Sequence, residues 1–80
     1  MAPITLQRLM RELAKLKQEQ DKGLKSADYD TRLARIIQEL RERGLDADRA
    51  ATTAALADAV KQGVITPPVE AHLRQRLGLA

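Results

Sequence analysis

The chain has 80 residues, a formal net charge of +3 and 44% hydrophobic residues, with Tyr29 as its one aromatic side chain. This length allows one small domain with an aliphatic core of low net stability. The absence of cysteine excludes disulfides and cysteine-ligated zinc as additional stabilisers. No apolar run is long enough to span a membrane, and the first residues lack the layout of a signal peptide. We therefore expect a single cytoplasmic domain covering residues 1–80, without membrane contact.

Three glycines divide the chain into four segments: Gly23, Gly44 and Gly63. A residue type that commonly caps helix N-termini follows each of them closely: Ser26, Asp46 and Thr66. Glycine just past a helix end adopts the left-handed conformation that stops the helix. Serine, threonine and aspartate then accept hydrogen bonds from the first unpaired amides of the next helix. The pattern predicts an all-α fold, a small bundle of four helices joined by short glycine corners, without strands.

The first expected helix spans about Leu6 to Asp21, with Thr5 as its cap. Its leucines recur at alternating spacings of three and four residues, which is typical of a heptad pattern. These leucines are Leu6, Leu9, Leu13 and Leu16. Two interpretations of this apolar stripe remain open. It faces the core of the chain's own bundle, or it pairs with a second chain, which the small size of the core favours.

The second expected helix spans about residues 27 to 43 and carries an apolar face of Tyr29, Leu33, Ile36, Ile37 and Leu40. The third spans about residues 47 to 62 and is rich in alanine. Its predicted buried face is thin and consists of Ala50, Ala54, Ala57 and Val60, with Leu56 beside it. The fourth spans about residues 67 to 77, with Val69, Leu73 and Leu77 in line. Two prolines at its start suit a first helical turn, whose amides lack internal acceptors.

The corner at Gly23 and the corner at Gly63 match at a constant offset of 40 residues. In each, a glycine is followed by an aliphatic residue, a hydroxyl cap and an acidic first helical turn. The match divides the domain into hairpin-like units of about residues 5–43 and 46–78. The match reflects either the stop and cap residues that helical hairpins commonly share or a duplication, and both explanations remain open.

The stretch LAKLKQEQDKGLKSADYDTRLARII resembles the SHOCT (short C-terminal domain) family. The residues that carry the resemblance are Gly23, Leu24, Ser26, Asp28, Tyr29 and Asp30. A weaker copy consists of Gly63, Val64, Ile65, Thr66 and Glu70, where Val69 replaces the aromatic residue. The resemblance covers about half the chain. It implies an element for oligomerisation or protein interaction rather than for chemistry.

Residues suited to catalysis are scarce. His72 is the one histidine, cysteine is absent, and no glycine-rich phosphate loop is present. Asp28 and Asp30 are two positions apart, so their side chains diverge on a helix. We therefore expect no enzyme activity, no catalytic, cofactor-binding or metal-binding residues, and no small-molecule substrate.

Basic residues exceed acidic residues only in the N-terminal part of the chain. Possible phosphate contacts in the first helix are Arg8, Arg11, Lys15 and Lys17, and in the last helix Arg74 and Arg76. The last helix follows a glycine corner, as the recognition helix of a helix-turn-helix does. However, Asp58 and Gln62 occupy positions that such a motif needs buried and apolar. Nucleic-acid binding remains an alternative.

The sequence as a whole favours a non-enzymatic interaction, oligomerisation or regulatory module. Its expected interface is the stripe Leu6, Leu9, Leu13 and Leu16. The partner is another protein or a second copy of the chain, as in a homodimer. The alternatives are a small DNA-binding regulator that uses the basic first helix or the last helix, and a structural accessory subunit of a larger assembly.

Overall fold

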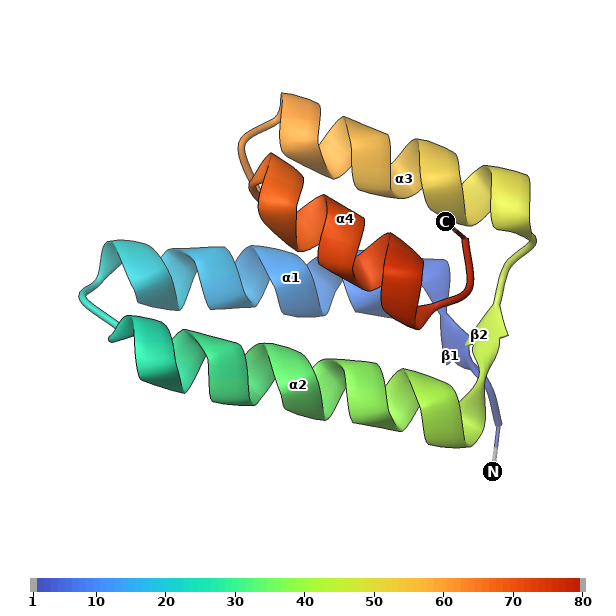
Figure 1. Cartoon of the computed structure of the whole chain (residues 1–80), viewed down its shortest axis with the longest axis horizontal. Helices are drawn as coiled ribbons and strands as arrows, with labels where there is room; N and C mark the ends of the chain where they lie inside the picture. Colours follow the sequence, from blue (N-terminus) through green and yellow to red (C-terminus); the bar gives the residue numbers. More distant parts are fainter. Residues whose placement is uncertain (1, 80) are drawn as a thin grey trace.

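The computed structural model describes residues 2–79, which form four helices and one pair of very short strands (Figure 1). In chain order the elements are β1 (Ile4–Thr5), α1 (Leu6–Asp21), α2 (Ser26–Arg43), β2 (Leu45–Asp46), α3 (Arg49–Lys61) and α4 (Pro67–Arg76). The predicted all-α class is therefore confirmed. The predicted helix boundaries agree within one residue, except that α3 starts two residues later than expected.

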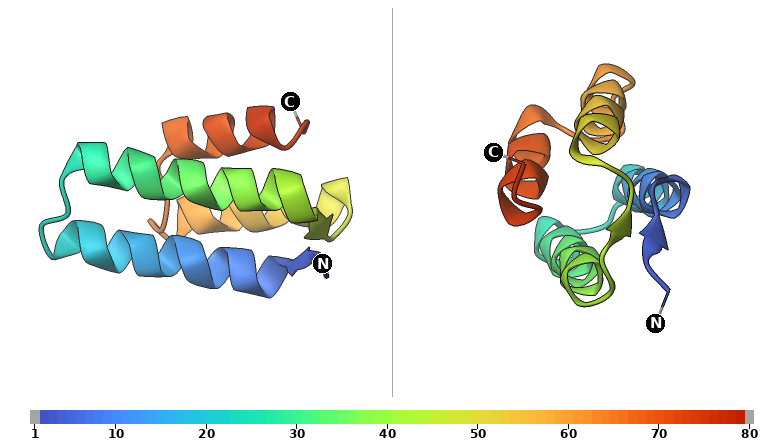
Figure 2. Two further views of the ribbon diagram at one scale, coloured as in Figure 1. Left: turned by 90° about the horizontal axis from the view of Figure 1, so that it is seen from below. Right: turned by 90° about the vertical axis from the view of Figure 1, so that its right-hand side faces the viewer.

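The helices pack as two hairpins that share one interior (Figures 1 and 2). Helix α1 packs against α2, helix α3 packs against α4, and α1 also packs against α3. Close approaches between α2 and α4 are sparser than in these three pairs. The bundle is thus least tightly closed along the seam between α2 and α4.

The core is aliphatic apart from Tyr29, as the composition predicts. Every element except β2 contributes at least one apolar side chain to it. The buried apolar residues are Ile4, Leu9, Leu13, Leu16, Tyr29, Leu33, Ile37, Leu40, Leu56, Ala59, Ile65 and Leu73. Ile65, in the corner between α3 and α4, is 4% exposed and belongs to the same core.

Two of the four helix caps differ from the sequence prediction. Thr5 and Thr66 cap α1 and α4, and their side chains accept hydrogen bonds from backbone amides three residues further on. Ser26 is instead the first residue of α2, and its neighbour at the cap position makes no side-chain hydrogen bond. Asp48, not Asp46, caps α3: its Oδ1 accepts from the amide of Ala51 at 2.6 Å.

The strand pair explains why Asp46 is unavailable as a cap. Ile4 pairs with Leu45 and Thr5 with Asp46 in parallel register, so β2 occupies the chain before α3 begins. Gly44 makes this arrangement possible. Its φ of 81° stops α2, and its carbonyl accepts a hydrogen bond of 2.9 Å from the amide of Ile4. The prediction of no strands was wrong here, because two residues are too few to show an alternating pattern.

The buried face of α3 also differs from the prediction. Ala50, Ala54 and Ala57 are exposed, whereas the residues that α3 buries are Thr52, Leu56 and Ala59. Burying one leucine removes more apolar area from water than burying one alanine, so the single leucine of α3 sets the inward face. Thr52 tolerates burial because its hydroxyl donates to the carbonyl of Asp48 at 2.8 Å.

Candidate functional site

The leucine stripe of α1 lies inside the bundle. Leu9 and Leu13 are each 1% exposed and Leu16 is 3% exposed, whereas Leu6 is only partly buried. In the folded chain, Leu9, Leu13 and Leu16 offer no surface to a second molecule. The prediction that these leucines form a docking face is therefore corrected: their contacts are with the chain's own helices.

The predicted nucleic-acid contacts lie on two helices, and two of them are held in ion pairs. Arg8 pairs with Glu39, and Lys17 pairs with Asp21. On α1 this leaves Arg11 and Lys15, which are exposed and make no ion pair within residues 2–79. Arg74 and Arg76 stand at the end of another helix, α4, and Arg74 is partly buried.

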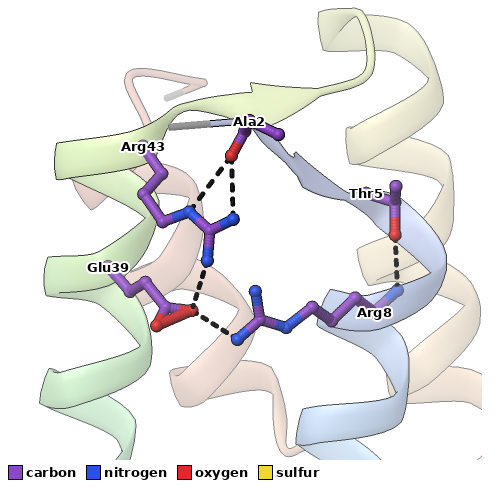
Figure 3. A network of polar contacts seen from close by, with 5 residues as sticks. All are labelled: Ala2, Thr5, Arg8, Glu39 and Arg43. Atoms are coloured by element: carbon purple, nitrogen blue, oxygen red, sulfur yellow. Dashed lines mark hydrogen bonds and ion pairs between the residues drawn. The ribbon is translucent and has the colours of Figure 1, made fainter.

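Arg8 belongs to a polar network that holds the start of the chain on α2 (Figure 3). Its Nη2 lies 2.7 Å from Oε1 of Glu39, and Nη1 of Arg43 lies 3.9 Å from the same oxygen. Arg43 also donates from Nε and Nη2 to the carbonyl of Ala2, at 3.1 and 2.9 Å. These side chains therefore serve the fold, since they join α1, α2 and the segment before β1.

A hollow of about 330 Å³ lies along the loosely closed seam between α2 and α4. We call it the α2/α4 groove. The lining residues are Asp30, Leu33 and Ala34 from α2, and Pro68, Val69 and His72 from α4. On each helix these positions follow the three- and four-residue spacing of a single helical face. The hollow therefore lies between the two helix faces that point toward each other.

The side chains explain why this seam stays open. Ala34 contributes only one methyl group, and Pro68 is a short ring in the first turn of α4. Beneath them the interior is closed, because Leu33 is 6% exposed and Leu73 is completely buried. Val69 is half-buried, so an aliphatic surface remains within reach from outside.

Each helix contributes one polar residue to the groove lining: Asp30 comes first among the α2 residues, and His72 comes last among the α4 residues. Asp30 and His72 are both exposed, and the four residues between them in the lining are apolar. No three histidine, aspartate or glutamate side chains within residues 2–79 gather closely enough to hold a metal ion. The chemistry that this arrangement offers is apolar contact bordered by one carboxylate and one imidazole.

Local sequence patterns do not reveal this groove. They place Val69 on the apolar line of the last helix and the prolines in its first turn, and they place Ala34 on no apolar face. The sequence does contain one small residue beside Leu33 and two adjacent prolines. These residues indicate a groove only once α2 and α4 are known to lie side by side.

No protein-family model, no curated protein and no solved structure matches this chain. Within the described range of 2–79, no helix is both long enough and apolar enough to cross a bilayer.

Proposed function

We propose that this protein is a non-enzymatic interaction module whose α2/α4 groove receives an aliphatic side chain from a partner protein. The observation that carries the proposal is the groove itself, an apolar hollow of about 330 Å³ between two helices that pack sparsely. Recognition of an amphipathic segment by a groove between helices uses such a surface.

The expected partner segment is apolar at the point of contact and polar around it. Ala34, Pro68 and Val69 supply contact area, and within residues 2–79 the lining side chains make no hydrogen bond that such a segment would have to break. Interface energy concentrates in a few well-packed side chains surrounded by polar ones. One leucine-sized residue, seated between Ala34 and Val69 and flanked by polar neighbours, fits this description.

The test is the substitution Ala34→Glu, with Ala57→Glu as the matched control. Both alanines are exposed helix positions, but only Ala34 lines the groove. Each tagged variant is used for cross-linking and affinity capture from its native host, with quantitative mass spectrometry. We expect A57E to retain the cross-linked partner and A34E to lose it, while both show the circular dichroism of the parent.

Loss of a partner in A34E together with its retention in A57E supports the proposal. Retention of all partners by A34E contradicts the proposal. Sedimentation across a range of concentrations identifies the occupant further: a self-association that A34E abolishes and A57E preserves would make a second copy of the chain the partner.

A further inference from the structure

A second cavity, of about 310 Å³, lies at the opposite end of α2 from Asp30. Here the C-terminal ends of α2 and α4 meet the N-terminal end of α3 (Figure 1). Each of these three helix ends contributes one arginine to the lining: Arg41, Arg49 and Arg76. We call this space the arginine cavity. It is separate from the α2/α4 groove, with which it shares no lining residue.

The three guanidinium groups are available for a ligand. All three arginines are exposed, and none of them forms an ion pair with another residue in the range 2–79. The lining contains one acidic residue, Asp48, whose Oδ1 already accepts from the amide of Ala51. With three positive charges against one negative charge, the cavity has a surplus of positive charge.

Much of the cavity lining is apolar. It includes the four leucines Leu40, Leu45, Leu77 and Leu79. Leu40 is 3% exposed, whereas the other three are only partly buried and so remain accessible from the cavity. The lining thus combines cationic and aliphatic side chains, and this combination is suited to a ligand with an anionic head and an apolar body.

Helix dipoles account for two of the arginines but oppose the third. Arg41 and Arg76 lie in the last turns of α2 and α4, where positive charge is favourable. Arg49 is the first residue of α3, where positive charge is unfavourable. Because local electrostatics disfavours arginine at this position, its presence points to a role other than helix stability.

We propose that the arginine cavity binds a small organic oxyanion, a phosphate monoester or a carboxylate, that carries a short apolar group. Guanidinium groups bind such oxyanions through paired hydrogen bonds. The three arginines hold the head group, and the leucines cover the apolar group. The proposal is independent of the groove function, because Ala34→Glu leaves this cavity unchanged.

The test titrates the isotope-labelled full chain with hexyl phosphate and follows backbone amide shifts by nuclear magnetic resonance. We expect saturable shifts at the start of α3 and around Leu77. Arg49→Gln and Arg76→Gln should each weaken binding about tenfold. Arg11→Gln, an exposed arginine on α1 outside the cavity, should leave the affinity unchanged. If R49Q and R76Q bind as tightly as the parent, the proposal is overturned.

Three further probes test the head group and the apolar group separately. Equal affinity for inorganic phosphate would mean an adventitious ion only, and equal affinity for hexyltrimethylammonium would mean apolar adsorption only; either result overturns the proposal. Heptanoate distinguishes a carboxylate from a phosphate ligand. Binding of either hexyl phosphate or heptanoate that is tighter than binding of inorganic phosphate, and that is weakened in R49Q, supports the proposal. Thermal melting without ligand shows that R49Q is folded, and we expect its midpoint to be no lower than that of the parent.

Discussion

The guanidinium group of Arg8 lies 2.7 Å from the carboxylate of Glu39, across the contact between α1 and α2 (Figure 3). Nearer the corner of the same hairpin, Arg32 of α2 pairs with Glu19 of α1. The signs are reversed between the two pairs, since α1 supplies the base in one and the acid in the other. A shift of α2 along α1 would separate both pairs, so they favour the observed alignment of the hairpin.

The first prediction concerns the strength of the Arg8–Glu39 pair. Both side chains are 40% exposed, and pairs with such exposure couple by about 0.5 kcal/mol. A double-mutant cycle with Arg8→Ala and Glu39→Ala, measured by urea denaturation, should give a coupling of about this size that decreases at high salt. A coupling that is unchanged by salt would contradict an electrostatic origin.

The second prediction tests the interior position of the α1 leucines. Leu9→Ala should lower the free energy of unfolding by about 3 kcal/mol, because it leaves a cavity in a closed core. Leu6→Ala, at a partly exposed position, should cost clearly less. Both are measured by urea denaturation together with sedimentation. A change in association state without loss of stability in L9A would restore the stripe as a docking surface.

The third prediction tests which face of α3 is buried. Ala59 is 5% exposed, whereas Ala54 is exposed. Ala59→Lys should prevent stable folding, because it forces a long charged side chain into a closed interior. Ala54→Lys should change the free energy of unfolding by no more than about 0.5 kcal/mol. Circular dichroism melting compares them directly. Equal tolerance of both substitutions would mean that α3 lies differently.

The fourth prediction concerns alkaline pH. Burial raises the pKa of the Tyr29 hydroxyl above its ordinary value of 10.0, the charge of Asp30 raises this pKa further, and Lys17 lowers it. The folded chain therefore holds this proton more tightly than the unfolded chain. The resulting stabilisation is complete below the unfolded pKa and is lost as the pH rises through the folded pKa.

Tyrosinate absorbance should therefore titrate with a midpoint above that of the urea-unfolded chain. The urea midpoint should fall between about pH 9 and pH 11 more steeply in the parent than in Tyr29→Phe. Because both proteins contain the same lysines, the comparison removes the contribution of lysine titration. Asp30→Asn should move the Tyr29 titration to lower pH. An unchanged titration in D30N would show that the aspartate does not act on the hydroxyl.

The positions of α1 and α2 follow directly from local patterns. Their apolar spacings and the glycine stops predict both helices and the inward faces that contain Leu13 and Leu33. The predicted and the observed inward faces agree because a leucine-rich stripe is wider and more apolar than any other face of these helices. The sequence left open whether the α1 stripe faces its own chain, and the burial of Leu13 decides this.

By itself, then, the sequence determined the all-α class, the four helices and their glycine corners, since these depend on residues within a few positions of each other. Tertiary structure alone decided the pairing of Ile4 with Leu45, the burial of the Leu56 face of α3, and both cavities. Arg41, Arg49 and Arg76 are unremarkable along the chain and form one cavity only because three helix ends converge. Such sites arise from distances between elements, and these are set by how the whole core packs rather than by any local propensity.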